Sequence, residues 1–169
     1  MVKPIIWAVV FSFVAAVLQS TLFARITLLY GAVPDIALII VVFSAYANGM
    51  MIGQLSGFFS GIALDVLSAS PPGLNSLVRT LIGALAGLMK GTFFMNSFLL
   101  PMLLCAAATL LKALIFFFLS LIFPGAVPSY SIASPALWIE MALNVFIAPF
   151  LFALLKRFSP MLAGRRERA

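Results

Sequence analysis

Ionisable and amide side chains inside otherwise apolar segments are the residues of this chain best able to do chemistry. Asp65 and Arg79 flank a short Pro/Gly turn, and Lys112 precedes Glu140 and Asn144, which are four residues apart. A lone charge at the centre of a bilayer costs about 2.5–3.5 kcal/mol, so each such group needs a partner, an aqueous path or a function. The chemistry open to them is therefore ion pairing, or the binding of a substrate or a proton.

We interpret these residues as two buried pairs. Asp65 and Arg79 are predicted to neutralise each other and to fix the register of a helical hairpin, with a substrate or proton site as the alternative. Lys112 and Glu140 form the second predicted pair. Asn144 lies one helical turn from Glu140 and makes a polar notch with it, and the long lysine stem can reach towards both. A binding role for this second cluster stays open.

Two further polar residues lie near the ends of apolar segments, and helix capping accounts for the second of them without any chemistry. Gln19 lies near the end of the first apolar segment and is placed to line the same region as Lys112. Asp35 follows Pro34 at the start of the second segment. An acid in the first turn of a helix complements the positive end of the helix dipole and its free N–H groups.

The residue inventory argues against an enzyme and against a resident metal or cofactor. The chain has no histidine, which removes the commonest general base and the commonest metal ligand. Its single cysteine, Cys105, excludes an intramolecular disulfide and a CxxC redox pair. A Ser/Lys dyad around Lys112 has no supporting pattern. The sequence therefore predicts no catalytic site, no metal and no cofactor.

Composition sets the protein class. The chain has 169 residues, of which 64% are hydrophobic and only 8% are charged, whereas a soluble domain carries about a quarter charged residues. The sequence predicts an all-α polytopic membrane protein whose six spans form one transmembrane domain over residues 1–158, followed by a short basic tail over 159–169. Because a span needs about 20 apolar residues, we place the spans at about 5–24, 33–48, 51–69, 74–94, 98–123 and 135–155.

The distribution of basic residues predicts the orientation. With the amino terminus inside, only Arg25 falls on the outer side, and both termini are cytoplasmic. An excess of Lys and Arg marks the cytoplasmic side of membrane proteins. The residues expected on that side are Lys3, Lys90, Lys156, Arg157, Arg165, Arg166 and Arg168. The net charge of +6 is thus a feature of topology and of contact with lipid, not of nucleic-acid binding.

Two stripes of glycine at spacing four lie next to the first charged pair. Residues four apart share one face of a helix, and small residues on such a face let two membrane helices approach closely. The stripes are therefore predicted to pack two antiparallel helices, or to offer part of one face to a partner. Their members are Gly53, Gly57 and Gly61 in the third span, and Gly83, Gly87 and Gly91 in the fourth.

The stretch 34–91 resembles MreD, the small membrane subunit of the bacterial rod-shape (elongation) machinery. The residues that carry the resemblance are Pro34-Asp35, the Gly53/Gly57/Gly61 stripe, Leu64-Asp65, the turn Ser70-Pro71-Pro72-Gly73-Leu74-Asn75 and the glycine-rich fourth span. The family commonly has leucine where this chain has Pro72, which stiffens the turn. The six-helix arrangement of the family is similar to the substrate-binding subunits of energy-coupling-factor vitamin transporters.

The resemblance implies a non-enzymatic scaffold of the bacterial cytoplasmic (inner) membrane. Its expected partner is MreC, a single-span protein with an extracytoplasmic coiled coil. RodA, a class B penicillin-binding protein and the actin-like MreB belong to the wider assembly that organises peptidoglycan synthesis along the side wall. The alternative is the vitamin-binding subunit of a transporter, whose pocket is supplied by Gln19, Lys112, Glu140 and Asn144. Copurification of MreC, or of a bound vitamin and a transporter ATPase module, separates the two.

Overall fold

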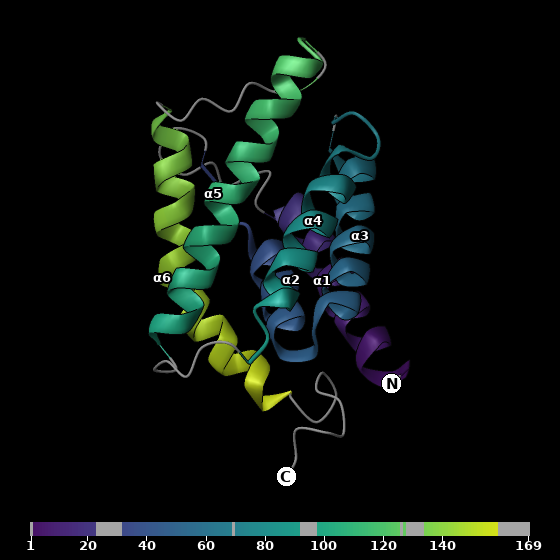
Figure 1. Cartoon of the computed structure of the whole chain (residues 1–169), viewed down its shortest axis with the longest axis vertical. Helices are drawn as coiled ribbons and strands as arrows, with labels where there is room; N and C mark the ends of the chain where they lie inside the picture. The colour runs from purple at the N-terminus through teal and green to yellow at the C-terminus, as the bar shows by residue number, and fades with distance from the viewer. Residues whose placement is uncertain are drawn as a thin grey trace.

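Six helices follow one another in a computed structural model of the chain, which describes residues 2–22, 32–68, 70–91, 98–125, 127 and 134–158 (Figure 1). No strand occurs in these ranges. The helices are α1 (Val2–Leu22), α2 (Ile36–Asn48), α3 (Met50–Leu67), α4 (Leu74–Leu88), α5 (Leu99–Ile122) and α6 (Pro135–Arg157).

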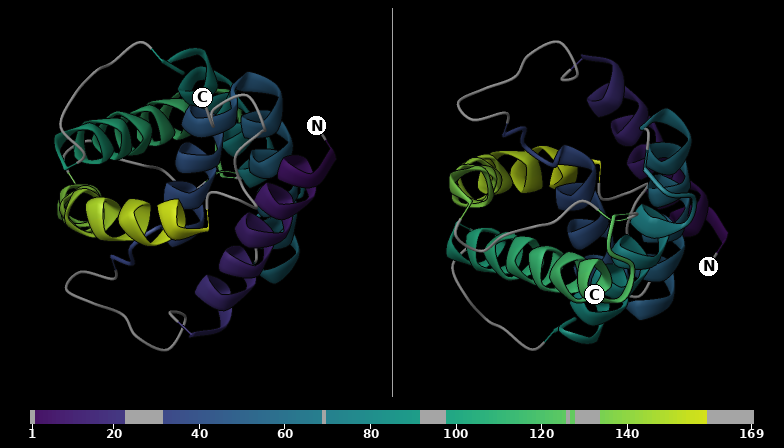
Figure 2. Two further views of the ribbon diagram at one scale, coloured as in Figure 1. Left: turned by 90° about the horizontal axis from the view of Figure 1, so that it is seen from below. Right: turned by 90° about the horizontal axis from the view of Figure 1, so that it is seen from above.

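The helices form two groups around a central one. The antiparallel hairpin of α3 and α4 packs with α1 on one side, and the pair of α5 and α6 lies on the other (Figures 1 and 2). Between them lies α2, which packs against each of the other five helices. The start of α1 and the end of α6 lie at the same end of the bundle.

The composition of α2 explains its central place. Every residue from Ala37 to Ala45 is buried, so this helix has no exposed face along most of its length. A helix that is hydrophobic all round belongs in a core. The charged side chains that contact α2 meet at its start, around Asp35.

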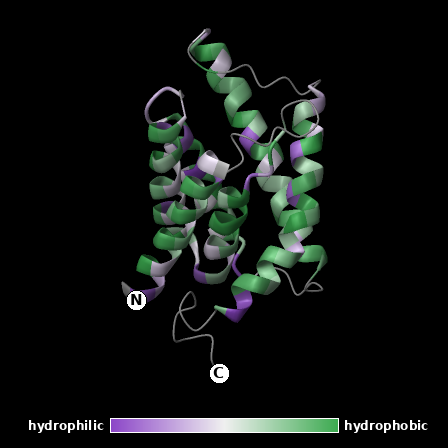
Figure 3. Ribbon diagram, turned by 180° about the vertical axis from the view of Figure 1, so that it is seen from behind, coloured by the Kyte–Doolittle hydropathy of each residue, from purple (hydrophilic) through white to green (hydrophobic). Residues whose placement is uncertain are grey.

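The expected class, an all-α polytopic membrane protein, is confirmed. Four helices, α1, α3, α5 and α6, are long and apolar enough to cross a membrane. Their ribbons are predominantly hydrophobic along their length (Figure 3), and many large apolar side chains point outwards, such as Phe58, Leu110 and Phe146. Such a surface matches a lipid environment.

Two helices are shorter than the predicted spans. The 13 residues of α2 reach only about 20 Å at the rise of an α-helix, against about 30 Å of hydrocarbon. The span expected over 74–94 is wrong at its end, because α4 stops at Leu88. Gly91 lies in the turn that follows, at a φ of 73°, where glycine is favoured. A Cβ there would meet nothing within 4 Å, so Gly91 is not part of the packing stripe.

Candidate functional site

The two glycine stripes face each other inside the α3–α4 hairpin. A Cβ on Gly53 would collide with the carbonyl oxygen of Gly83, and one on Gly83 with that of Gly53. On Gly57 it would strike the backbone carbonyl of Arg79, and on Gly61 the backbone of Ser76. Backbones this close leave no room for any side chain, which is how small residues bring membrane helices together.

The second stripe is also packed against the backbone of α3. A Cβ on Gly87 would collide with the backbone of Met50, at the start of α3. Gly53, Gly57, Gly61, Gly83 and Gly87 are all buried. The glycine faces thus serve packing within the chain, and the expectation that part of one is offered to a partner is wrong for these five positions.

Asp65 closes the turn between the two helices. Its carboxylate accepts hydrogen bonds from the backbone N–H groups of Gly73 (3.1 Å), Asn75 (2.9 Å) and Ser76 (3.2 Å). The Asn75 amide and the Ser76 hydroxyl each donate a further bond, both at 3.0 Å. The first N–H groups of a helix have no partner within it. The N-cap of α4, Gly73, has no side chain to supply one, so Asp65 caps α4 from the end of α3.

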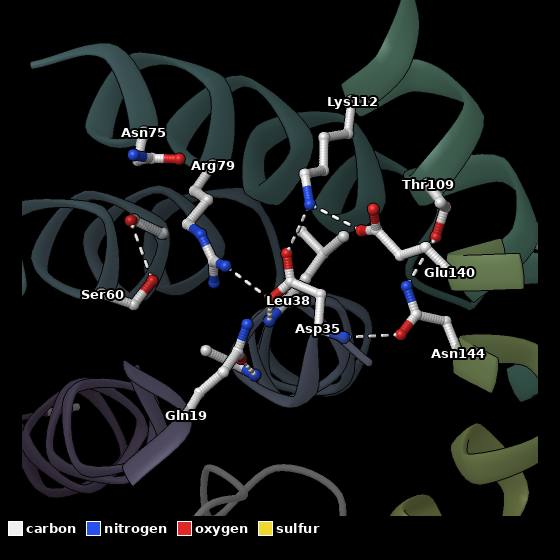
Figure 4. A network of polar contacts seen from close by, with 12 residues as sticks. Gln19, Asp35, Leu38, Ser60, Asn75, Arg79, Thr109, Lys112, Glu140 and Asn144 are labelled. Atoms are coloured by element: carbon white, nitrogen blue, oxygen red, sulfur yellow. Dashed lines mark hydrogen bonds and ion pairs between the residues drawn. The ribbon is translucent and has the colours of Figure 1, made fainter. Parts of the chain in front are cut away.

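The predicted Asp65–Arg79 pair is wrong. Arg79 Nη2 instead lies 2.5 Å from Asp35 Oδ1, and Figure 4 shows Arg79 pointing towards α2. The five donors around Asp65 satisfy its carboxylate without a cation. Both side chains of the new pair are almost completely buried, with 4% of Arg79 and 3% of Asp35 exposed. A charge this deep needs its partner nearby.

Asp35 is the centre of the polar network (Figure 4). As the N-cap of α2 it accepts a hydrogen bond from the Leu38 N–H at 3.0 Å. Its Oδ2 also lies 2.9 Å from Lys112 Nζ, and its own N–H donates to Asn144 Oδ1 at 2.8 Å. One residue at the start of the central helix is thereby tied to α4, α5 and α6. The interpretation of Asp35 as a simple helix-dipole acid is incomplete for this reason.

The second predicted cluster is assembled around the same point. Lys112 Nζ lies 2.6 Å from Glu140 Oε1, so the lysine bridges two carboxylates. Asn144 sits one turn further along α6, where its Nδ2 donates to Thr109 Oγ1 at 3.0 Å. Asn144 and Thr109 are both buried. With two acids and two bases, the network made by Asp35, Glu140, Arg79 and Lys112 is formally neutral.

A pocket of about 230 Å³ opens over the network, and we call it the α1–α6 pocket. Its lining includes Gln19, Val33, Asp35, Lys112, Ala136 and Glu140. Gln19 Oε1 also accepts the N–H of Ala37 at 3.0 Å, a second side-chain cap on α2. Gln19 therefore lies where the sequence placed it, beside Lys112 and Glu140.

Sequence reasoning missed the role of Asp35 and of Thr109. Helix capping was enough to account for Asp35 in the sequence. Nothing in local spacing links it to its partners 44 and 77 residues away. One available signal was its place at the start of an unbroken apolar helix, since a buried helix draws polar partners to its ends. Thr109 lies three residues before Lys112, on the same helix face, which was a weaker signal.

The residues shared with the suspected family build the two caps. Pro34 and Asp35 open α2, whereas Gly73 and Asn75 donate their backbone N–H groups to Asp65. Pro71 accepts a hydrogen bond from the Leu74 N–H at 3.2 Å and so closes the turn. Within the described ranges no group of three His, Cys, Asp or Glu residues is arranged to hold a metal ion. The arrangement fixes helices relative to one another and presents a small polar pocket.

Comparison with known proteins identifies the family. Residues 1–158 match the family described as rod shape-determining protein MreD. Comparisons with curated proteins and with solved structures give no match. The expected likeness to vitamin-transporter subunits therefore stays a prediction.

Proposed function

Because the chain belongs to the MreD family of rod shape-determining proteins, we propose that it is a scaffold of the elongation machinery in the bacterial cytoplasmic membrane. The family is one of shape-determining membrane proteins, not of enzymes. In this proposal the transmembrane domain over residues 1–158 binds MreC. Through MreC, or directly, it helps to position RodA, a class B penicillin-binding protein and MreB. The observation that carries the proposal is the family match over nearly the whole chain.

The partner's helix needs a surface, and the outer face of α4 supplies one. Leu77, Leu81, Leu85 and Leu88 follow one another at helical spacing and are all exposed. The opposite face of α4 is sealed against α3 by the glycines, so this leucine ridge is held in a fixed position. Rows of residues four apart form the ridges that pack into the grooves of another helix. We propose that the single membrane helix of MreC packs there.

The first experiment is a mild-detergent pull-down of the tagged protein, with mass spectrometry of proteins and small molecules. Recovery of MreC and of elongation synthases supports the scaffold. Recovery of an ATPase module or of a tightly bound vitamin would overturn it in favour of a transporter subunit. The volume of the α1–α6 pocket argues against the latter, because 230 Å³ is below the roughly 300–1,000 Å³ of pockets that hold drug-sized ligands.

The leucine ridge is tested separately in the same assay. The double variant Leu81→Trp/Leu85→Trp keeps an apolar surface that lipid tolerates, but it blocks close packing of a helix, so MreC recovery is expected to fall about tenfold or more, as for the loss of a packed anchor. The matched control is Phe146→Trp/Phe150→Trp on the exposed face of α6. If the control loses MreC and the ridge variant does not, the surface has been assigned to the wrong helix.

A further inference from the structure

The guanidinium group of Arg79 has hydrogen-bonding capacity that the ion network does not use. Its Nη2 lies 2.5 Å from Asp35 Oδ1. Its other terminal nitrogen, Nη1, is buried and has no hydrogen-bond acceptor among the described residues. Leaving a buried donor unsatisfied costs about 1–3 kcal/mol, and more where the donor is charged. Nη1 therefore indicates an acceptor in addition to the protein groups described.

The side-chain amide of Gln19 offers a second donor at the same place. Its Oε1 accepts the N–H of Ala37. Only the oxygen end of an amide can accept, so the Nε2 end is left to donate elsewhere.

The first turn of α2 brings this amide close to the guanidinium. The N–H of Ala37 is held by Gln19, and the next N–H, of Leu38, is held by Asp35 Oδ1, the same oxygen that contacts Arg79. Gln19 and Arg79 are therefore fixed at neighbouring points of one helix turn. Figure 4 shows both side chains on the same side of Asp35. Two N–H donors meet there, from α1 and from α4.

The α1–α6 pocket gives water a route to this point. Gln19 and Asp35 both line it, and its volume of about 230 Å³ has room for several water molecules. A buried water needs a cavity of about 10–15 Å³ or more and two to four polar partners. The charged residues in the lining are Asp35, Glu140 and Lys112. Two acids and one base disfavour an anion, whereas water carries no charge.

We propose that a bound water molecule lies between Arg79 and Gln19 and bridges α4 to α1. Its oxygen accepts hydrogen bonds from Arg79 Nη1 and Gln19 Nε2, and it donates to further water in the α1–α6 pocket. The pocket is then the entry by which solvent reaches the ion network. The bridging water completes the solvation of a charge that the helices bury. This proposal does not depend on the partner protein.

Water-edited solid-state NMR of the full chain in lipid bilayers tests the proposal. Arginine is isotope-labelled, and the signals that disappear in Arg79→Lys are those of Arg79. Magnetisation that starts on water is expected to reach the Arg79 Nη nitrogens about as fast as those of Arg157, whose side chain is exposed. Transfer no faster than to the backbone nitrogen of Arg79, a buried residue of α4, would overturn the proposal.

Two variants locate the water. Ala136→Phe fills the pocket and is expected to abolish the fast transfer to Arg79. Its matched control, Ala142→Phe on the exposed face of the same helix, is expected to keep it. Gln19→Leu has a similar size but no amide, so the fast transfer is expected to be lost although the pocket stays open.

Unchanged transfer in Gln19→Leu would contradict the bridge, and equal transfer in the two alanine variants would contradict the route. A thiol-reactive dye shows that each variant is folded, because Cys105 is buried in the folded chain. The bridge and the route are thus tested by different side chains.

The same signals distinguish water from an anion. Exchange of chloride for gluconate in the buffer is expected to leave the Arg79 Nη signals in place. A shift that saturates as chloride is added back would show that an anion lies between the two donors, and the assignment to water would be wrong.

Discussion

Asp35 connects the start of α2 with three other helices. Its carboxylate holds Arg79 from α4 and Lys112 from α5, and its backbone N–H is held by Asn144 from α6. Removing one partner of a buried ion pair costs about 3–5 kcal/mol, because the other charge is left buried and unpaired. The same loss at Asp35 removes an acid from both Arg79 and Lys112, of which Lys112 keeps its contact with Glu140. The residue is therefore a joint between helices in addition to a helix cap.

Double-mutant cycles test which acid Arg79 pairs with. Asp35→Asn and Arg79→Gln are each expected to destabilise the protein by about 3 kcal/mol or more, and the double variant by clearly less than the sum. Asp65→Asn combined with Arg79→Gln is expected to be additive within about 0.5 kcal/mol, because the two share no partner. Thermal unfolding in detergent can be followed with a thiol-reactive dye, since the only cysteine, Cys105, is buried. Coupling in the Asp65 cycle and none in the Asp35 cycle would restore the pairing first predicted.

Among the elements, the two helices of the α3–α4 hairpin are the most closely packed pair. Glycine lets the two backbones touch along their length, and Asp65 locks the turn with five hydrogen bonds. The α5–α6 pair contains no glycine and is joined to the hairpin by direct packing of α5 against α4, through α2 and through the polar network. Packing against α3 therefore fixes the position of α4 and of the leucine ridge on its outer face.

A single added methyl group tests the glycine seam. Gly57→Ala places a Cβ against the Arg79 carbonyl, which neither backbone can avoid without moving, so we expect a loss of about 1–3 kcal/mol or more. The control is Ala107→Leu on the exposed face of α5, which adds more volume where only lipid lies. Unfolding followed through Cys105 compares the two. Equal unfolding temperatures for both variants would mean that the helices are not in contact at Gly57.

In the molecule as a whole, the basic residues lie at one end of the bundle, and the α1–α6 pocket and the α3–α4 turn lie at the other. Lys3 at the start of α1, Lys90 after α4, and Lys156 and Arg157 at the end of α6 all belong to one end of the bundle. The α1–α6 pocket and the capped α3–α4 turn belong to the other. An excess of basic residues marks the cytoplasmic side, so the pocket is expected to face outwards.

Cysteine labelling in intact cells checks this orientation. In a Cys105→Ala background, Pro72→Cys in the α3–α4 turn is expected to react with a membrane-impermeant maleimide. Lys90→Cys is expected to react only after the cells are permeabilised. The Cys105→Ala protein itself, which has no thiol, gives the background signal. The reverse pattern would place both termini outside and would move the pocket to the cytoplasmic face.

Composition and periodicity were enough to predict the membrane class, the number and order of the helices in the described ranges, and the glycine hairpin. Each follows from composition or from a repeat at the helical period. Such a repeat places its residues on one face of a helix, whatever the rest of the chain does. The sequence also placed Lys112, Glu140 and Gln19 in one region, because antiparallel neighbours bring equal depths together. The extent of α4 was missed, since an apolar run does not show where a turn intervenes.

The partner of Arg79 could be identified only in the folded chain. Spacing placed Asp65 and Arg79 at similar depth, but depth does not determine which way a helix is rotated. In the folded chain the glycine contact rotates α4 so that Arg79 reaches the start of α2. The Asp65 carboxylate instead accepts hydrogen bonds from the N–H groups at the start of α4. Pairings across 44 and 77 residues depend on how several helices are turned and offset together. Periodicity within one helix carries no information on that arrangement.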